Sequence, residues 1–131
     1  MGSLLTHLTL HVEDLNACIS FYERYCGLKV IDDQERNSMR SVCMSAPGGE
    51  GIVIQMMSGG KDQQAAPDSN RHFGFTLDSR EAVDEIAARG KEEGILIWPP
   101  EEGPFPVGYL CGLNDPNGNT VEFSYGHLIE V

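Results

Sequence analysis

The sequence has little positive charge and no long apolar run. Lys and Arg together number 9 against 20 Asp and Glu, so the formal net charge is −11. A polyanion repels nucleic-acid phosphates and anionic membrane surfaces, and we therefore expect neither as a partner. Hydrophobic residues make up 40% of the chain, but they nowhere form the run of roughly 18 residues that suggests a membrane span. We expect a soluble globular protein.

The chain also lacks a Cys-x-x-Cys pair and lacks a start that is first basic and then apolar. Its four cysteines are Cys18, Cys26, Cys43 and Cys111. This spacing favours reduced core thiols over a cysteine metal cluster or a disulfide framework. Because no signal-peptide pattern is present, the prediction is a cytoplasmic protein.

What the sequence does contain is a repeat of one element order. In the first half, residues 4–12 alternate as a half-buried strand does, and a helix is predicted from an N-cap at Asp14 to a stop at Gly27. Three further strands are predicted over residues 28–35, 39–46 and 51–57.

The second half runs in the same order. A strand is predicted over 72–77, and a helix over 79–93 that starts at a capping box of Asp78 and Glu81 and stops at Gly94. Three more strands are predicted over 95–98, 108–113 and 119–125.

The repeat predicts one α+β domain over residues 1–131. It consists of module one (1–58), a linker (59–70) and module two (71–127). One module alone buries too little apolar surface to be stable, so two modules must pair, within one chain or between two chains.

Four polar side chains coincide under this repeat. His7 and His72 lie in the first strand of each module, and Gln55 and Glu122 lie in the last strand. The neighbours of each are mostly apolar, so alternation directs all four polar side chains to the face away from the helices. Taken singly, a strand histidine is more often hydrogen-bonded or exposed than a ligand. Together, two imidazoles, a carboxylate and an amide oxygen predict a site for one divalent metal ion.

Two segments carry a family resemblance. Residues 6–15 (THLTLHVEDL), with Phe21-Tyr22 and Gly27-Leu28 after them, resemble the opening of the vicinal oxygen chelate superfamily, and residues 115–123 (DPNGNTVEF) resemble its closing motif. That superfamily includes glyoxalase I, fosfomycin-resistance thiol transferases, type I extradiol dioxygenases and bleomycin-resistance proteins.

The resemblance implies two tandem βαβββ modules that form an incomplete, mixed β-barrel around a metal-binding cleft. It implies ligands at His7, Gln55, His72 and Glu122, and an ion that is Ni, Zn, Mn or Fe. The ion holds two neighbouring oxygens of a small-molecule substrate, which stabilises negative charge as it develops on them.

The resemblance leaves several chemistries open. A glyoxalase-like isomerase or lyase uses Glu122 as catalytic base, although Gln55 stands where glyoxalase I usually has Glu and an amide cannot accept a proton. An extradiol dioxygenase uses His7, His72 and Glu122 as a facial triad on Fe(II), with His11 as the candidate acid or base.

Two further alternatives involve the substrate side. A fosfomycin-type transferase shares the opening with Thr9 on the site face, but the few cations of this chain match a dianion poorly. A drug-binding protein of the bleomycin-resistance type has an apolar cleft, and candidate residues to line it are Met44, Met57, Trp98, Phe105 and Tyr109. Because this chain keeps the metal-ligand residues, we favour the enzyme, and we expect a homodimer with sites shared between chains.

Overall fold

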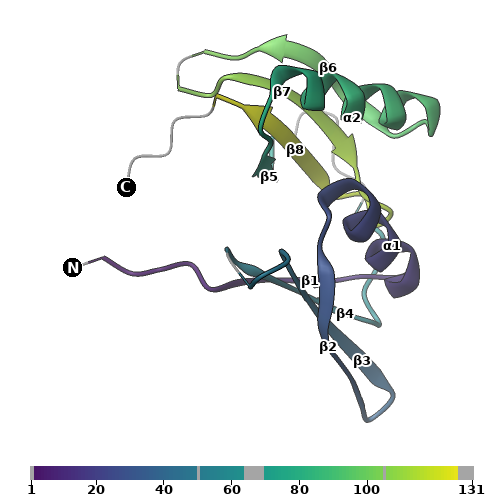
Figure 1. Cartoon of the computed structure of the whole chain (residues 1–131). Helices are drawn as coiled ribbons and strands as arrows, with labels where there is room; N and C mark the ends of the chain where they lie inside the picture. Colours follow the sequence, from purple (N-terminus) through teal and green to yellow (C-terminus); the bar gives the residue numbers. More distant parts are fainter. Residues whose placement is uncertain (1, 50, 64–69, 105, 127–131) are drawn as a thin grey trace. The chain divides into compact units, whose positions relative to one another are not determined.

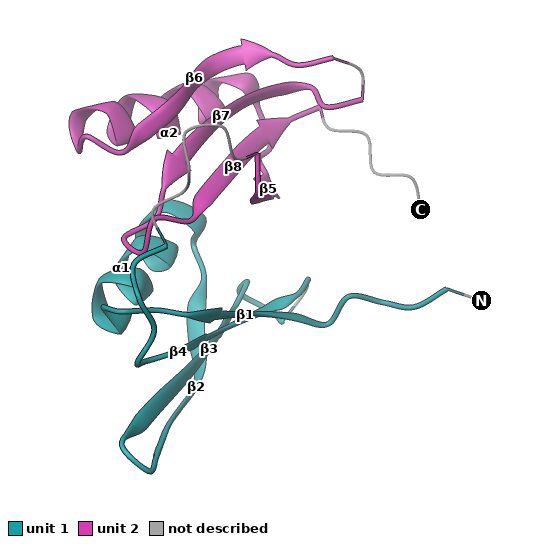
Figure 2. Ribbon diagram, turned by 180° about the vertical axis from the view of Figure 1, so that it is seen from behind, with its two compact units in different colours: residues 1–63 teal, residues 64–131 magenta. Residues whose placement is uncertain are grey.

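The computed structural model describes residues 2–49, 51–63, 70–104 and 106–126, and it divides the chain into two compact units. Unit 1 spans residues 1–63 and unit 2 spans residues 64–131 (Figure 2). Each unit contains one helix and one four-stranded sheet (Figure 1). Neither helix of the described chain is long and apolar enough to span a membrane.

Unit 1 has the element order strand, helix and three strands. Its sheet has the order β1-β4-β3-β2, in which β1 runs parallel to β4 and the other neighbours are antiparallel. The elements are β1 (His7–His11), α1 (Leu15–Cys26), β2 (Lys29–Arg36), β3 (Met39–Ser45) and β4 (Val53–Met57).

Unit 2 repeats this topology. Its sheet has the order β5-β8-β7-β6, with β5 parallel to β8 and the other pairs antiparallel. The elements are β5 (His72–Thr76), α2 (Arg80–Glu92), β6 (Leu96–Glu102), β7 (Tyr109–Asn114) and β8 (Thr120–Tyr125). The predicted pair of βαβββ modules is therefore confirmed, and each sheet is open with two edge strands.

The helices begin and end where their local chemistry requires. The Asp14 carboxylate accepts a hydrogen bond from the Ala17 N–H at the start of α1. At the end of α1, Gly27 takes φ 67° and donates to the Glu23 carbonyl, a left-handed position that favours glycine. The predicted N-cap and stop of this helix are confirmed.

The predicted capping box of α2 is wrong. Ser79, and not Asp78, is the N-cap, because its backbone is extended and its hydroxyl accepts from the Ala82 N–H. Glu81 is then only two residues from the cap, so it cannot form the reciprocal bond that a capping box needs at the third position.

Two predicted strand boundaries are also wrong. Strand β1 begins at His7 and not at residue 4, since Leu4 and Leu5 are 90% and 73% exposed. Strand β6 continues through Pro99 and Pro100 to Glu102, beyond the predicted end at residue 98. Proline is tolerated there because β6 is the edge strand and its register shifts between Trp98 and Glu101.

One face of each sheet forms the core. In unit 2, the Cys111 thiol donates to the Val83 carbonyl of α2, and a Cβ on Gly90 of α2 would meet Leu113 at 2.9 Å. Helix α2 therefore covers the face of β7 that carries Cys111 and Leu113. The opposite face carries the polar residues that form the candidate site.

Candidate metal centre

In unit 1, strand register determines how His7 lies relative to Gln55. His7 pairs with Val53 across the parallel β1–β4 ladder, and Thr9 pairs with Gln55. Gln55 is thus two residues beyond the partner of His7 and on the same face of the sheet. The flanking Ile54 and Met56 are buried on the other face.

Unit 2 places His72 and Glu122 in the equivalent relationship. His72 pairs with Thr120 across the parallel β5–β8 ladder, and Gly74 pairs with Glu122. The flanking Val121 and Phe123 are buried on the opposite face. Each unit therefore presents one imidazole and one oxygen donor on the same sheet face. In both units the oxygen donor lies two residues beyond the histidine's partner on the neighbouring parallel strand.

Both imidazoles have their Nδ1 atom occupied by the protein. His72 Nδ1 lies 2.6 Å from the Asn70 carbonyl oxygen, so this nitrogen must carry the hydrogen and donate it. His7 Nδ1 lies 3.0 Å from the Thr6 hydroxyl. Fixing Nδ1 in this way orients the ring and leaves Nε2 as the nitrogen that can bind a metal.

The Glu122 carboxylate lies beside the available nitrogen of His72. Glu122 Oε1 is 3.7 Å from His72 Nε2, and the two side chains are 14% and 34% exposed. This separation is long for a hydrogen bond. It is close to the ~3.4 Å between two ligands that each lie about 2.1 Å from a tetrahedral ion. The pair fits the donor set of a divalent metal.

Glycine makes room for this carboxylate. A Cβ on Gly74, the residue opposite Glu122, would lie 3.1 Å from Glu122 Oε2. On the other side Glu122 pairs with Gly112, where a Cβ would meet the Trp98 ring at 2.5 Å. The Trp98 ring in turn meets the His72 ring edge to face, with centroids 5.1 Å apart. Trp98 therefore shares the face of His72 and Glu122.

Gln55 is held quite differently from Glu122. Its Oε1 accepts a hydrogen bond from the Thr9 hydroxyl at 3.0 Å, and its Nε2 donates to the Ser41 hydroxyl at 3.0 Å. These bonds come from the strands on both sides, so the orientation of the amide is fixed. Glu122 has glycine at the facing positions of both neighbouring strands and receives no hydrogen bond from the described residues.

The other predicted site residues divide between the two sheet faces. His11 and Met57 lie on the Gln55 face, but His11 is about 13 Å along the strand from His7, and its Nε2 lies 3.1 Å from the Ser58 carbonyl oxygen. Tyr109 lies on the α2 face, where its hydroxyl donates to Asp84. Met44 is fully buried. Phe105 lies outside the described residues.

Two of the cysteine thiols, those of Cys43 and Cys111, are poor metal ligands at neutral pH. Cys43 pairs with Gln55, and burial, followed by the charge of Asp32, raises the pKa of its thiol. Burial raises the pKa of the Cys111 thiol to about 12. Within the described ranges, moreover, three or more His, Cys, Asp or Glu side chains do not gather in one place. Each unit alone thus offers half of the predicted donor set.

A hollow of about 320 Å³ opens on the Gln55 face of unit 1. Sequence analysis missed the contribution of β2 to this hollow, because residues 32–36 (DDQER) are all polar and show no alternation that would assign a face. The hollow is lined by Asp32, Gln34, Arg36, Met39, Ser41, Cys43, Gln55 and Met57.

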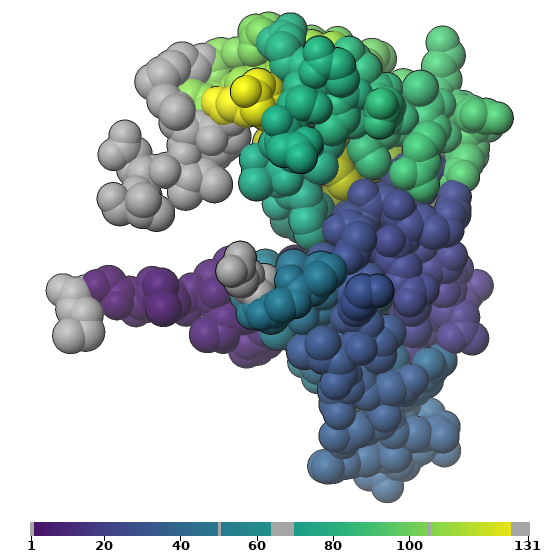
Figure 3. Space-filling model, viewed as in Figure 1, coloured from purple at the N-terminus to yellow at the C-terminus, as the bar shows by residue number. Residues whose placement is uncertain are grey.

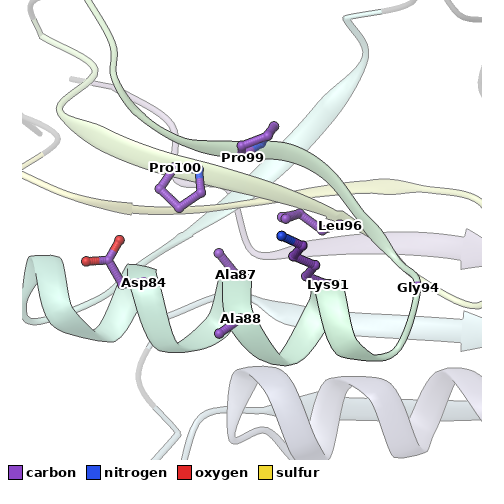
Figure 4. A pocket seen from close by; sticks show the side chains of 8 residues that line it. All are labelled: Asp84, Ala87, Ala88, Lys91, Gly94, Leu96, Pro99 and Pro100. Atoms are coloured by element: carbon purple, nitrogen blue, oxygen red, sulfur yellow. The ribbon is translucent and has the colours of Figure 1, made fainter.

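A second hollow, of about 520 Å³, lies between α2 and β6 in unit 2. Asp84 stands at one end and Lys91 at the other, with Ala87 and Ala88 between them and two prolines on the facing strand (Figure 4). Because α2 and Glu122 lie on opposite faces of the sheet, this hollow is separate from the His72–Glu122 pair.

Known proteins resemble the chain over nearly its whole length. The family model for the Glyoxalase/Bleomycin resistance protein/Dioxygenase superfamily matches residues 4–123. An uncharacterised protein of Pseudomonas aeruginosa is 50% identical over 127 residues, which cover 96% of this chain and 91% of that protein. A probable trivalent organoarsenical cleaving enzyme of Bacillus subtilis is 26% identical over 121 residues, 91% of this chain and 77% of the relative.

Among solved structures, a mutant of the fosfomycin resistance protein FosX from Listeria monocytogenes is similar to this chain. That crystal structure contains Mn(II) and 1S,2S-dihydroxypropylphosphonic acid. It is 26% identical with a TM-score of 0.74, and the match covers 95% of this chain and 93% of that one.

Gly74→Ala tests whether the space beside Glu122 matters for metal binding. Gly74 does not have a left-handed φ, so alanine fits the backbone, but its Cβ displaces the Glu122 carboxylate. We expect the affinity for Mn(II) to fall about tenfold, as for other changes beside a ligand, with unchanged far-UV circular dichroism. Calorimetric titration measures the affinity.

The control for Gly74→Ala is a double-mutant cycle with Glu122→Ala. If Gly74 acts through Glu122, adding Gly74→Ala to Glu122→Ala causes no further loss of affinity. Equal losses in both backgrounds would contradict this interpretation.

Proposed function

The chain belongs to the Glyoxalase/Bleomycin resistance protein/Dioxygenase superfamily, and on this basis we propose that it is an enzyme that depends on one divalent metal ion. His7, Gln55, His72 and Glu122 are the proposed ligands. The proposed activity is that of a glyoxalase-like isomerase or lyase, which acts on a small substrate with two neighbouring oxygens.

The observation that carries this proposal is the matched pair of half sites. Each unit has a histidine whose Nδ1 is occupied and whose Nε2 is available, and each has an oxygen donor two residues along the neighbouring parallel strand. A metal bound there would act as a Lewis acid toward the neighbouring oxygens of the substrate. The diol and Mn(II) in the FosX structure support this class of ligand and ion.

Glu122 is the proposed catalytic base. Among the described residues it has glycine at the facing positions of both neighbouring strands and receives no hydrogen bond, so a substrate proton can reach its carboxylate. Gln55 cannot take a proton, because its amide nitrogen is already a donor to Ser41 and its oxygen is a very weak base. Glu122 therefore removes the proton from the carbon beside the substrate oxygens, while Gln55 supplies a fixed neutral ligand.

Proposed substrate contacts are Trp98 and Met57, which share the sheet faces of the ligand pairs. Thr9 contributes by orienting Gln55. Tyr109 has no proposed role toward the substrate, since its hydroxyl bonds Asp84 beneath α2.

The test of metal dependence uses protein purified without an affinity tag. We expect one equivalent of Ni, Zn or Mn, and we expect His7→Ala and His72→Ala each to lower the affinity by at least tenfold, because each removes one of two imidazoles. His11→Ala is the matched control, because its Nε2 is bonded to the Ser58 carbonyl and it should bind metal as the wild type does.

Each outcome of the metal analysis has a distinct meaning. Labile Fe(II) as the only metal that supports turnover would favour extradiol-type oxygen chemistry instead. Protein that binds no divalent metal in any preparation would contradict the enzyme proposal and favour a drug-binding protein.

Gln55→Glu tests the role of the neutral ligand. The substitution adds a negative charge to a site that holds a doubly charged cation, so metal affinity should rise by about tenfold or more. Ser41 can turn its hydroxyl to donate to the new carboxylate, so the fold should tolerate the change. Gln55→Met is the opposite control, because it removes the amide oxygen proposed as the metal ligand and should lower metal affinity. Unchanged affinity in both variants would show that Gln55 is not a ligand.

The proposed assembly is a homodimer in which a site takes half its ligands from each chain. Each unit supplies only two ligands, so a complete site needs unit 1 of one chain and unit 2 of the same or a second chain. Two-fold symmetry is the commonest arrangement of soluble oligomers and generates two equal sites of this kind.

Mixing two inactive variants tests whether sites are shared. His7→Ala and Glu122→Ala are combined under conditions that exchange subunits. In a shared-site dimer, each mixed dimer has one site that lacks both residues and one site that is intact, so metal binding returns. Exchange without any recovery of metal binding would show that the four ligands come from one chain.

A further inference from the structure

The hollow on the Gln55 face of unit 1 contains the guanidinium of Arg36, which has no hydrogen-bond or ion-pair partner among the described residues. We propose that Arg36 binds a carboxylate of the substrate and so selects an elongated anionic molecule for the metal site. This inference rests on the proposed function, because it concerns the far end of the same substrate. It names a specificity-determining residue that lies outside the ligand set.

Arg36 differs from the other arginines of the described chain in having no partner there. Arg40 bonds both carboxylate oxygens of Asp33 and also the Asn16 side chain. Arg80 bonds Glu102 and lies over the Tyr109 ring. In a protein of net charge −11, few cationic groups can bind an anion, and a guanidinium without a partner is one of them. Its planar fork matches a carboxylate.

The sheet register places Arg36 on the same face as Gln55. Gln55 pairs with Cys43 on β3, and Cys43 pairs with Asp32 on β2. Arg36 lies four residues beyond Asp32 on β2 and pairs with Met39. Gln55 and Arg36 are therefore two strands and four residues apart, with about 16 Å between their Cα atoms. A molecule that touches both side chains must be elongated.

A tight hairpin fixes Arg36 at its position. Asn37 and Ser38 both have positive φ, 51° and 68°, and they join β2 directly to β3. Two positive φ values define the type I′ turn, whose twist matches that of the strands. The β2–β3 hairpin lies at the surface of unit 1 (Figure 3). Arg36 is exposed, so its guanidinium is accessible while its backbone is held.

The remaining lining determines the orientation of the substrate. Met57 lies beside Gln55 on β4, and Met39 pairs with Arg36, so thioether side chains lie between the two ends. Asp32 is in the row of Gln55 and accepts a hydrogen bond from Gln34. Its charge repels a carboxylate at that end, whereas Arg36 attracts one at the other end. The hollow thus favours a monoanion with an apolar middle.

The experiment uses a probe that contains both features. An ω-carboxyalkyl hydroxamate has two neighbouring oxygens for the metal and a carboxylate at the end of an alkyl chain, and its methyl ester lacks only the charge. We measure the affinity of Mn(II)-loaded protein for both by calorimetry, over a series of chain lengths. At the best length, the acid should bind at least tenfold more tightly than the ester.

Variants assign this preference to Arg36. Arg36→Gln should reduce the difference between acid and ester to less than twofold and leave Mn(II) affinity and ester affinity unchanged. Arg36→Lys should keep part of the preference, since a point charge replaces the fork. Lys29→Gln is the matched control, because it removes one positive charge from the same strand outside the hollow.

The outcomes separate the two proposals. Acid and ester that bind equally to the wild type, or a preference that survives Arg36→Gln, would overturn the role of Arg36 while the metal site stands. A preference that Lys29→Gln reduces as much as Arg36→Gln would show only general charge attraction and would also overturn it. Failure of both probes to bind the Mn(II)-loaded protein would instead refute the proposed metal site.

Discussion

The parallel pairing of the first and last strands within each unit is the constraint on which the candidate site depends. In a βαβββ module these strands are far apart in sequence, and only the β1–β4 and β5–β8 ladders bring His7 near Gln55 and His72 near Glu122. Because side chains alternate along a strand, a slip of one residue would turn each oxygen donor into the core and expose its apolar neighbours. Burial of Ile54, Met56, Val121 and Phe123 therefore maintains the register of the site.

The two half sites share this register but differ in what surrounds the oxygen donor. Thr9 and Ser41 bond the Gln55 amide from either side, whereas Gly74 and Gly112 face Glu122 and offer it no donor. One module thus holds its oxygen donor in a fixed orientation, whereas the other leaves its carboxylate without a hydrogen bond from the neighbouring strands, at 3.7 Å from His72 Nε2. That difference is what a site needs if one ligand positions the metal and the other also moves a proton.

Much of this arrangement could be predicted from the sequence. Burial of one sheet face gives a strand a period of two, and this period identified the strands, their faces and the four polar residues at equivalent positions.

The ends of helices and strands were harder to predict where neighbouring residues favour different boundaries. Asp78 and Ser79 are both good N-caps, and the choice between them depends on backbone geometry. Pro99 and Pro100 predicted the end of a strand, yet β6 continues through them because it is an edge strand, where proline is tolerated. Tyr109 was predicted to line a substrate cleft, but it lies on the face of β7 that α2 covers, where its hydroxyl donates to Asp84. The hydrogen bonds of Thr9 and Ser41 to Gln55 could not be predicted, because they depend on the register between strands, which the periodicity along one strand does not determine.

Net charge and local charge have opposite effects at this site. A chain with 20 acidic and 9 basic residues repels anions in general, so an anionic substrate needs a specific cation to overcome that field. Bound metal and Arg36 would supply positive charge at two separate points, and Asp32 would supply negative charge near the first. An anion that carries its charge close to the metal-bound oxygens meets Asp32, whereas one that carries it at the far end meets Arg36. If Arg36 binds the substrate as proposed, the length of the substrate, and not only its charge, would decide whether it is accepted, and the β2–β3 hairpin that holds Arg36 would set that length.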